Sequence, residues 1–203
     1  ELMRRGHKIV LMTDARSRAL DSTVFAQAEG HVIRGGGLAG RGAVRAAKAL
    51  MSLAAGVMQA RGLLARIEPG VVVGFGGYPC FPPVVAARLL PGGPGLVLHE
   101  QNGVLGRANR FLAQRILRRG RDVLALSLGN TTRVPVTVTI EVTGNPVRPA
   151  IMELGALAYE PPAETINLLI LGGSLGARVF SDVVPAALAL LPAEMRARLR
   201  VTQ

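Results

Sequence analysis

Short, continuously apolar segments alternate with longer helical segments along this chain. Strands that are apolar throughout are typical of a parallel sheet covered by helices on both faces. The segments predicted as strands are 8–13, 71–73, 96–98, 123–126, 136–142 and 166–171, and those predicted as helices are 41–67, 83–90, 104–118 and 178–191. The sequence therefore predicts an α/β protein built on a parallel sheet with helices on both faces.

The segment 148–165 is rich in Pro, Ala and Glu, and a new strand follows it at Ile166. This segment is predicted as a connection, with a domain boundary near Arg148: residues 1–148 form a first domain and residues 149–203 begin a second. Residues 1–5 read as the end of a helix and residues 201–203 as part of a strand. We therefore expect a strand and a turn before residue 1, and the remainder of the second domain after residue 203.

The net charge of +11, from 24 Lys and Arg against 13 Asp and Glu, favours a polyanionic partner. Aromatic residues make up only 3% of the chain, and single-stranded nucleic acids are bound by stacking on aromatic side chains. We therefore expect an anionic membrane surface or a phosphorylated ligand, and no nucleic acid. The longest charge-free run, 69–87, is interrupted by Pro and Gly, so a soluble or peripheral protein is predicted rather than a spanning one.

Cysteine and histidine are too few and too scattered to form a zinc site, and no metal or other cofactor is expected. Cys80 is the single cysteine, which excludes an internal disulfide and fits a reducing compartment. It has no base nearby in the sequence, so an inert small side chain is favoured over a nucleophile.

The motif Leu171-Gly-Gly-Ser-Leu-Gly-Ala-Arg178 directly follows an apolar strand and opens a helix. Gly172 and Gly173 permit a close backbone approach to a ligand, and the free N–H groups of the helix start attract a phosphate. The hydroxyl of Ser174 adds a donor. The alternative is a plain tight turn between strand and helix.

Two further loops follow predicted strands at the sheet edge where open α/β folds bind ligands. The loop 74–83 carries Tyr78, which could contact a sugar or a pyrophosphate, or the loop is only a rigid turn. The loop that begins His99-Glu100-Gln-Asn102 offers acceptors, donors and a possible proton carrier. The alternative for this loop is a helix N-cap, with Asn102 as the capping residue and the others in solvent.

Basic residues occupy two more positions of interest. Arg148 lies at the predicted domain boundary, where a guanidinium suits a phosphate, although it could equally be an ordinary surface residue. Arg41, Arg45 and Lys48 form a stripe along the predicted helix 41–67, beside an apolar face that contains Val44, Ala47, Met51, Ala54 and Met58. Such a helix can lie on an anionic membrane, or the apolar face can belong to the core.

Four segments together, 76–78, 99–103, 143–148 and 171–178, resemble the MurG family of N-acetylglucosaminyltransferases in order and spacing over essentially the whole chain. The resemblance implies a fold of the GT-B type, with two Rossmann-like domains. It also implies inverting transfer of N-acetylglucosamine from UDP-N-acetylglucosamine to undecaprenyl-pyrophosphoryl-N-acetylmuramyl-pentapeptide during peptidoglycan synthesis, by a peripheral protein at the cytoplasmic face of the bacterial inner membrane. The 203-residue chain by itself is expected to be inactive.

The resemblance implies a role for each motif. Asn102, Arg148 and Ser174 contact the donor, and Gly172 and Gly173 belong to its phosphate loop. Tyr78 lies on the acceptor side, with His99 and Glu100 as candidate catalytic residues. Arg41, Arg45 and Lys48 contact the membrane.

Three alternatives remain open from the sequence. They are a glycosyltransferase of the same fold with another lipid acceptor, a UDP-sugar epimerase, and a non-catalytic basic module that binds a membrane or nucleic acid.

Overall fold

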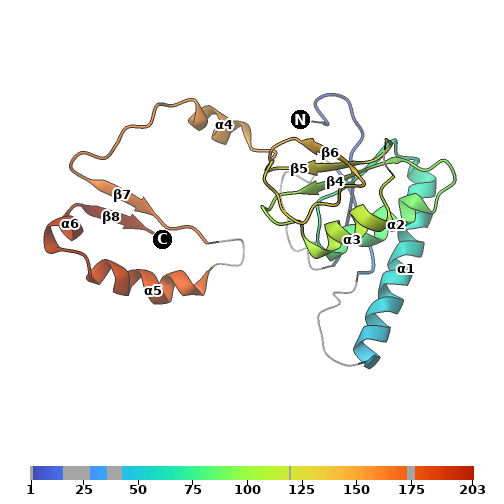
Figure 1. Ribbon diagram of the computed structural model, residues 1–203, viewed down its shortest axis with the longest axis horizontal. Coiled ribbons are helices and arrows are strands. Elements are labelled where there is room, and N and C mark those ends of the chain that lie inside the picture. Colours follow the sequence, from blue (N-terminus) through green and yellow to red (C-terminus); the bar gives the residue numbers. More distant parts are fainter. Residues whose placement is uncertain (1, 16–27, 36–42, 119, 173–176) are drawn as a thin grey trace. The chain divides into compact units, whose positions relative to one another are not determined.

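The computed structural model describes residues 2–15, 28–35, 43–118, 120–172 and 177–203 (Figure 1). The chain divides into two compact units, Glu1–Pro146 and Val147–Gln203, each of which is described by itself.

The first unit is built on a four-stranded sheet in which all neighbouring strands are parallel. In spatial order the strands are β3 (Val71–Gly74), β4 (Gly95–Glu100), β5 (Val123–Leu126) and β6 (Thr139–Val142). This finding confirms the predicted parallel α/β architecture. A separate two-stranded parallel sheet pairs β1 (Val10–Thr13) with β2 (Glu29–Val32). The strand β2 was not predicted, because Glu-Gly-His-Val lacks a continuous apolar run.

The helices of this unit are α1 (Ala43–Ile67), α2 (Phe81–Arg88) and α3 (Arg107–Arg115), and the short 3-10 helix η2 (Tyr78–Cys80) precedes α2. Helix α2 carries proline in its first turn, where the missing N–H costs no hydrogen bond. Helix α3 begins three residues later than the predicted residue 104, because the N–H of its N-cap residue Gly106 donates to the carboxylate of Glu100, the last residue of β4.

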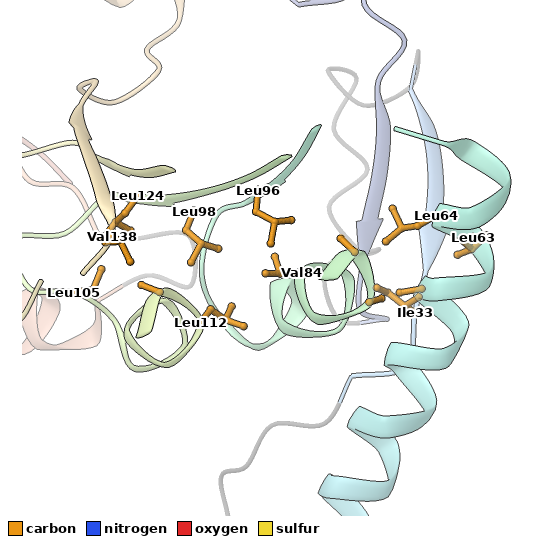
Figure 2. Packing of buried hydrophobic residues seen from close by; sticks show 14 of the residues in the cluster. Ile33, Leu63, Leu64, Val84, Leu96, Leu98, Leu105, Leu112, Leu124 and Val138 are labelled. Atoms are coloured by element: carbon orange, nitrogen blue, oxygen red, sulfur yellow. The ribbon is translucent and has the colours of Figure 1, made fainter. Parts of the chain in front are cut away.

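The core lies between the sheet and the helices α2 and α3 (Figure 2). Leu98 of β4, Leu124 of β5 and Leu112 of α3 have no exposed surface, and each stabilises the fold by about 1.5–3 kcal/mol through burial. The cluster continues to Leu64 of α1. Val71 and Val73 face the opposite side of the edge strand β3 and are half-exposed, so no helix of the described part of the chain covers this strand on that side.

The second unit pairs β7 (Ile166–Leu169) with β8 (Leu199–Thr202) in parallel. Its helices are α4 (Pro149–Gly155), α5 (Arg178–Ala189) and α6 (Ala193–Ala197). Helix α4 lies inside the segment predicted as a connection. That prediction overlooked that Pro149 fits the first turn of a helix and that good helix formers follow it.

Candidate functional site

Three loops are placed together by the carboxyl ends of the parallel strands β3, β4 and β5. The loop after β4 is tied to the loop after β5, because Thr132 N–H donates to Gly103 O over 2.9 Å and Leu105 N–H donates to Thr132 O over 3.0 Å. The loop after β3 approaches the same region, since a Cβ added at Gly76 would lie 3.1 Å from the amide nitrogen of Asn109. This edge of the sheet is therefore a built site rather than a set of independent turns.

A pocket of about 280 Å³ lies between the loop after β3 and the loop after β4. Its size is near the lower end for small-molecule sites in proteins. It is lined by Phe75, Gly76, Gly77, Tyr78, Glu100, Gln101, Asn102, Gly106, Arg107, Ala108 and Asn109. The pocket brings together three residues predicted for the site, Tyr78, Glu100 and Asn102.

Glu100, the last residue of β4, is 2% exposed and accepts four hydrogen bonds. One oxygen accepts from the backbone N–H of Asn102 at 3.1 Å and from its side-chain amide at 2.7 Å. The other accepts from Gly106 N–H at 2.8 Å and from the amide of Asn109 at 3.0 Å. Burial alone would raise the pKa of Glu100, but these hydrogen bonds outweigh it and hold the pKa below its ordinary value.

This geometry speaks against the catalytic role predicted for Glu100. A carboxylate with a lowered pKa and with both oxygens occupied is a poor general base. The N-cap alternative for Asn102 is wrong, because Gly106 is the N-cap residue of α3 and the Asn102 side chain bonds to Glu100 instead. The N-cap alternative also expected the residues beside Asn102 to lie in solvent. Glu100 is buried instead.

His99 lies beside the pocket at 5% exposure, with both ring nitrogens in contact with protein groups. Its Nε2 is 3.1 Å from the carbonyl oxygen of Gly144, and its Nδ1 is 2.8 Å from the side-chain nitrogen of Gln101. The ring also contacts that of Phe75, with centroids 5.6 Å apart. His99 therefore connects the loops after β3 and β4 to the segment that follows β6.

The other predicted donor contacts fall partly outside the described residues. Gly173 and Ser174 are outside them, whereas Gly172 is described and follows β7. Arg148 is exposed and is the N-cap residue of α4 in the second unit. The structure thus places Arg148 and Gly172 in a different unit from the pocket residues.

The helix predicted to contact the membrane is α1, and the apolar face predicted for it is exposed. Met51 is 72% and Met58 is 62% exposed, whereas the buried side of α1 carries residues such as Leu64. Lys48 is exposed. Arg41 lies outside the described residues, and Arg45 lies in α1 without a described side chain. The alternative that Met51 and Met58 belong to the core is therefore wrong.

Asn109 is the pocket residue that sequence reasoning missed. It is 2% exposed, and its Nδ2 donates to both Glu100 and the backbone oxygen of His99. Among the side chains that the structure describes, its Oδ1 is the one buried polar atom without a hydrogen-bond partner. The available signal is its spacing: it lies four residues after Leu105 and three before Leu112, on the buried face of α3.

Cys80 donates a hydrogen bond from Sγ to Gly77 O over 3.2 Å. Burial raises the pKa of its thiol to about 11, so the thiol stays protonated at neutral pH. The environment agrees with an inert side chain.

Acid should weaken the fold through Glu100. The ordinary pKa of glutamate is about 4.3, and Glu100 has a lower value in the folded chain. Between the two values only the unfolded chain binds the proton, so stability is lost as the pH falls toward the folded pKa. Urea unfolding across a pH series should show this loss for the wild type and a smaller one for Glu100→Gln. Parallel pH profiles for the two proteins would contradict the assignment.

Neither a metal-binding cluster nor a membrane-spanning helix is present in the described part of the chain. Within it, no group of three or more His, Cys, Asp and Glu side chains could hold a metal ion. None of the helices described there combines the length and the apolar character needed to cross a membrane.

The chain is similar to several known proteins. Residues 1–119 match the glycosyltransferase family 28 N-terminal domain. Over its whole length the chain is 59% identical to a protein of Granulibacter bethesdensis and 56% identical to one of Acidiphilium cryptum. Both are named UDP-N-acetylglucosamine–N-acetylmuramyl-(pentapeptide) pyrophosphoryl-undecaprenol N-acetylglucosamine transferase. The chain covers 52% and 54% of these relatives, so it spans about half the length of the curated relatives it matches.

The crystal structure of MurG from Acinetobacter baumannii is also similar, with a TM-score of 0.65 and 25% sequence identity. The match covers 99% of this chain and 60% of that one. It confirms the predicted architecture of the GT-B type. With the family match over more than half of its residues, the chain belongs to glycosyltransferase family 28.

Proposed function

We propose that this chain is the acceptor-side part of an inverting N-acetylglucosaminyltransferase. Its donor is UDP-N-acetylglucosamine and its acceptor is undecaprenyl-pyrophosphoryl-N-acetylmuramyl-pentapeptide, as the names of the relatives say of those proteins. The observation that carries the proposal is the pocket in which Tyr78 and Asn102, from two motifs of the resemblance, line one cavity. Neither motif alone is specific, but their convergence is what a shared ligand site requires.

In the proposed reaction an acceptor hydroxyl forms a bond to the anomeric carbon of the donor sugar while the bond to UDP breaks. The hydroxyl proton passes to a base, and UDP leaves with the bonding electrons. Glu100 and His99 have their basic atoms in contact with protein groups, so we assign the base to another residue. Asn102, Arg148 and Ser174 hold the donor in this proposal, with Gly172 and Gly173 at its phosphates, and Tyr78 contacts the acceptor.

The test is transfer of labelled N-acetylglucosamine by the chain extended to the full length of its relatives. A short-chain muramyl-pentapeptide lipid serves as acceptor, and a diacylglycerol serves as the control acceptor. Transfer to the muramyl lipid alone supports the proposal. Transfer to diacylglycerol indicates another lipid-directed glycosyltransferase, and consumption of the donor without any acceptor indicates an epimerase. A folded protein with none of these activities leaves the basic binding module, which salt-sensitive binding to nucleic acid would reveal.

We also propose that α1 holds the protein at the cytoplasmic face of the inner membrane as a peripheral protein. The support is the exposed pair Met51 and Met58 beside Lys48, on a chain of net charge +11. Apolar side chains that enter a lipid interface next to basic ones bind anionic membranes.

Loss of those two methionines should weaken membrane binding. In Met51→Ser/Met58→Ser, we expect sedimentation with vesicles containing anionic lipid to weaken by about tenfold or more, because two apolar side chains no longer leave water. The matched control is Met152→Ser, since Met152 is 63% exposed in the second unit. Equal binding by all three proteins would exclude α1 as the contact.

A further inference from the structure

The hydrogen bonds at Glu100 fix which way the neighbouring amide groups point. An ionised carboxylate has no proton to donate, so every group within hydrogen-bond distance of it must be a donor. The side-chain group of Asn102 that lies 2.7 Å from Glu100 Oε1 is therefore its NH₂, and the same holds for Asn109 at 3.0 Å from Oε2. For Asn109 the assignment is made twice, because the same nitrogen is 3.1 Å from the carbonyl oxygen of His99.

Each of these amides is left with its oxygen directed away from Glu100. The oxygen of Asn109 is buried, and a Cβ added at Gly76 would lie 3.5 Å from it, so a ligand does not reach it directly. Asn102 is exposed and lines the pocket. Its oxygen is an amide acceptor that a bound molecule can meet.

The side-chain amide of Gln101 also has its nitrogen, and not its oxygen, in contact with a protein group. The carbonyl of Gly144 can only accept, so the His99 nitrogen that faces it, Nε2, carries the proton. In the neutral ring Nδ1 is then an acceptor, and the Gln101 group 2.8 Å from it is the NH₂. Gln101 also lines the pocket, so a second amide in the loop has its nitrogen engaged with protein.

We infer that Glu100 is a positioning residue that holds Asn102 with its amide oxygen toward the ligand, which makes Asn102 a selector for a hydroxyl or amide N–H of a sugar. This inference rests on the proposed function. A phosphate oxygen would be repelled by the amide oxygen, whereas a sugar hydroxyl or an acetamido N–H would donate to it. Gly106 N–H, at the start of α3, is also taken by Glu100 and does not compete for a ligand.

A reversal of the hydrogen bond tests the inference. In Glu100→Gln, the new side-chain oxygen can still accept from Gly106 and Asn109, but its NH₂ then faces both the backbone N–H and the side-chain NH₂ of Asn102. Asn102 must turn over and present a donor to the ligand. In Asn102→Asp, two carboxylates face each other. In the double variant Glu100→Gln/Asn102→Asp, the glutamine NH₂ donates to one aspartate oxygen, and the other oxygen again meets the ligand as an acceptor.

We expect each single variant, in the full-length form used for the transfer assay, to lose about 10- to 100-fold in kcat/KM, the range for a hydrogen bond to a charged group. The double variant should recover the part of that loss that comes from the side chain of residue 102, whereas the backbone N–H of that residue still faces the glutamine NH₂. If instead Glu100 were the base, the double variant would remain as inactive as Glu100→Gln, and that result would overturn the inference. The control Glu153→Gln, on the exposed helix α4, makes the same chemical change away from the pocket and should match the wild type.

Failure of the inference can be separated from failure of the proposed function. The wild-type transfer rate tests the function, and the ratio among the variants tests the role of Glu100. If the wild type transfers nothing, urea unfolding of the wild type, the two single variants and the double variant still tests the hydrogen bond between Glu100 and Asn102. The double variant should then be more stable than the sum of the two single changes predicts. Strict additivity would overturn the inference.

Discussion

Asp122→Ala is expected to lower the free energy of unfolding of the first unit by about 3–5 kcal/mol, which is the range for breaking a buried ion pair from one side. Asp122 has no exposed surface and forms an ion pair with Arg88, whose side chain is 13% exposed. Its two oxygens also accept from Leu96 N–H at 3.0 Å and from Arg118 N–H at 2.7 Å. Removal of the carboxylate leaves two backbone donors and one nitrogen of the buried Arg88 guanidinium without their acceptor, while the Nε of Arg88 still donates to Ile116 O at 3.1 Å.

Urea unfolding followed by circular dichroism measures this loss, and two variants serve as controls. Asp122→Asn keeps the shape and one acceptor oxygen, so it should lose less than the alanine variant. Glu29→Ala removes an exposed carboxylate near Lys8 and His31 and should change stability by about 1 kcal/mol or less. If Asp122→Ala lowers the free energy of unfolding no more than Glu29→Ala does, the ion pair does not stabilise the unit.

The sequence predicted the main strands because burial leaves a direct trace in composition. The runs 96–98 and 123–126 are apolar throughout and are mostly buried in β4 and β5. The run 71–73 is equally apolar and forms β3, although Val71 and Val73 are half-exposed there. The strand β2 leaves no such trace, because Gly30 and His31 interrupt its apolar pattern. Partners from distant parts of the chain decide whether such a segment pairs.

The chemistry of the site was predictable only as far as residue types go. The motif predicted that Glu100 and Asn102 face a ligand site, and both line the pocket. Glu100 accepts hydrogen bonds from Gly106 and Asn109, and these help to lower its pKa. Both donors come close to Glu100 because α3 begins there. Asp122 gave no sequence signal at all, since an aspartate after Gly and Arg before a strand is typical of an exposed turn.

The role of a glycine in α1 could not be predicted from the sequence either, because it depends on a contact between α1 and the segment after β2. Gln59 of α1 accepts from Arg34 N–H at 3.0 Å and donates to Val32 O at 3.1 Å. One turn earlier in the helix, a Cβ added at Gly56 would lie 1.9 Å from the carbonyl oxygen of Arg34 and 3.3 Å from a ring carbon of Pro82. The backbone of α1 can therefore approach this segment only where no side chain intervenes.

Gly56→Ala should consequently lower the free energy of unfolding by about 3 kcal/mol, at the upper end for inserting a methyl group into a packed site. The obstructing atom belongs to backbone, so α1 must move away, and the two hydrogen bonds of Gln59 and the burial of Ile33, which is 2% exposed, weaken with it. Urea unfolding measures the loss. A thermal shift toward greater stability in Gly56→Ala would contradict the close approach.

Gly62→Ala is the matched control, because Gly62 belongs to the same helix and a Cβ added there meets nothing within 4 Å. Alanine restricts the unfolded chain and favours the helix, so this variant should gain about 0.5–1 kcal/mol. In the sequence the two glycines are equivalent interruptions of one helical segment. Opposite signs for the two substitutions would show that the glycine at position 56 is required by the packing of α1 against Arg34, and the same sign for both would remove that explanation.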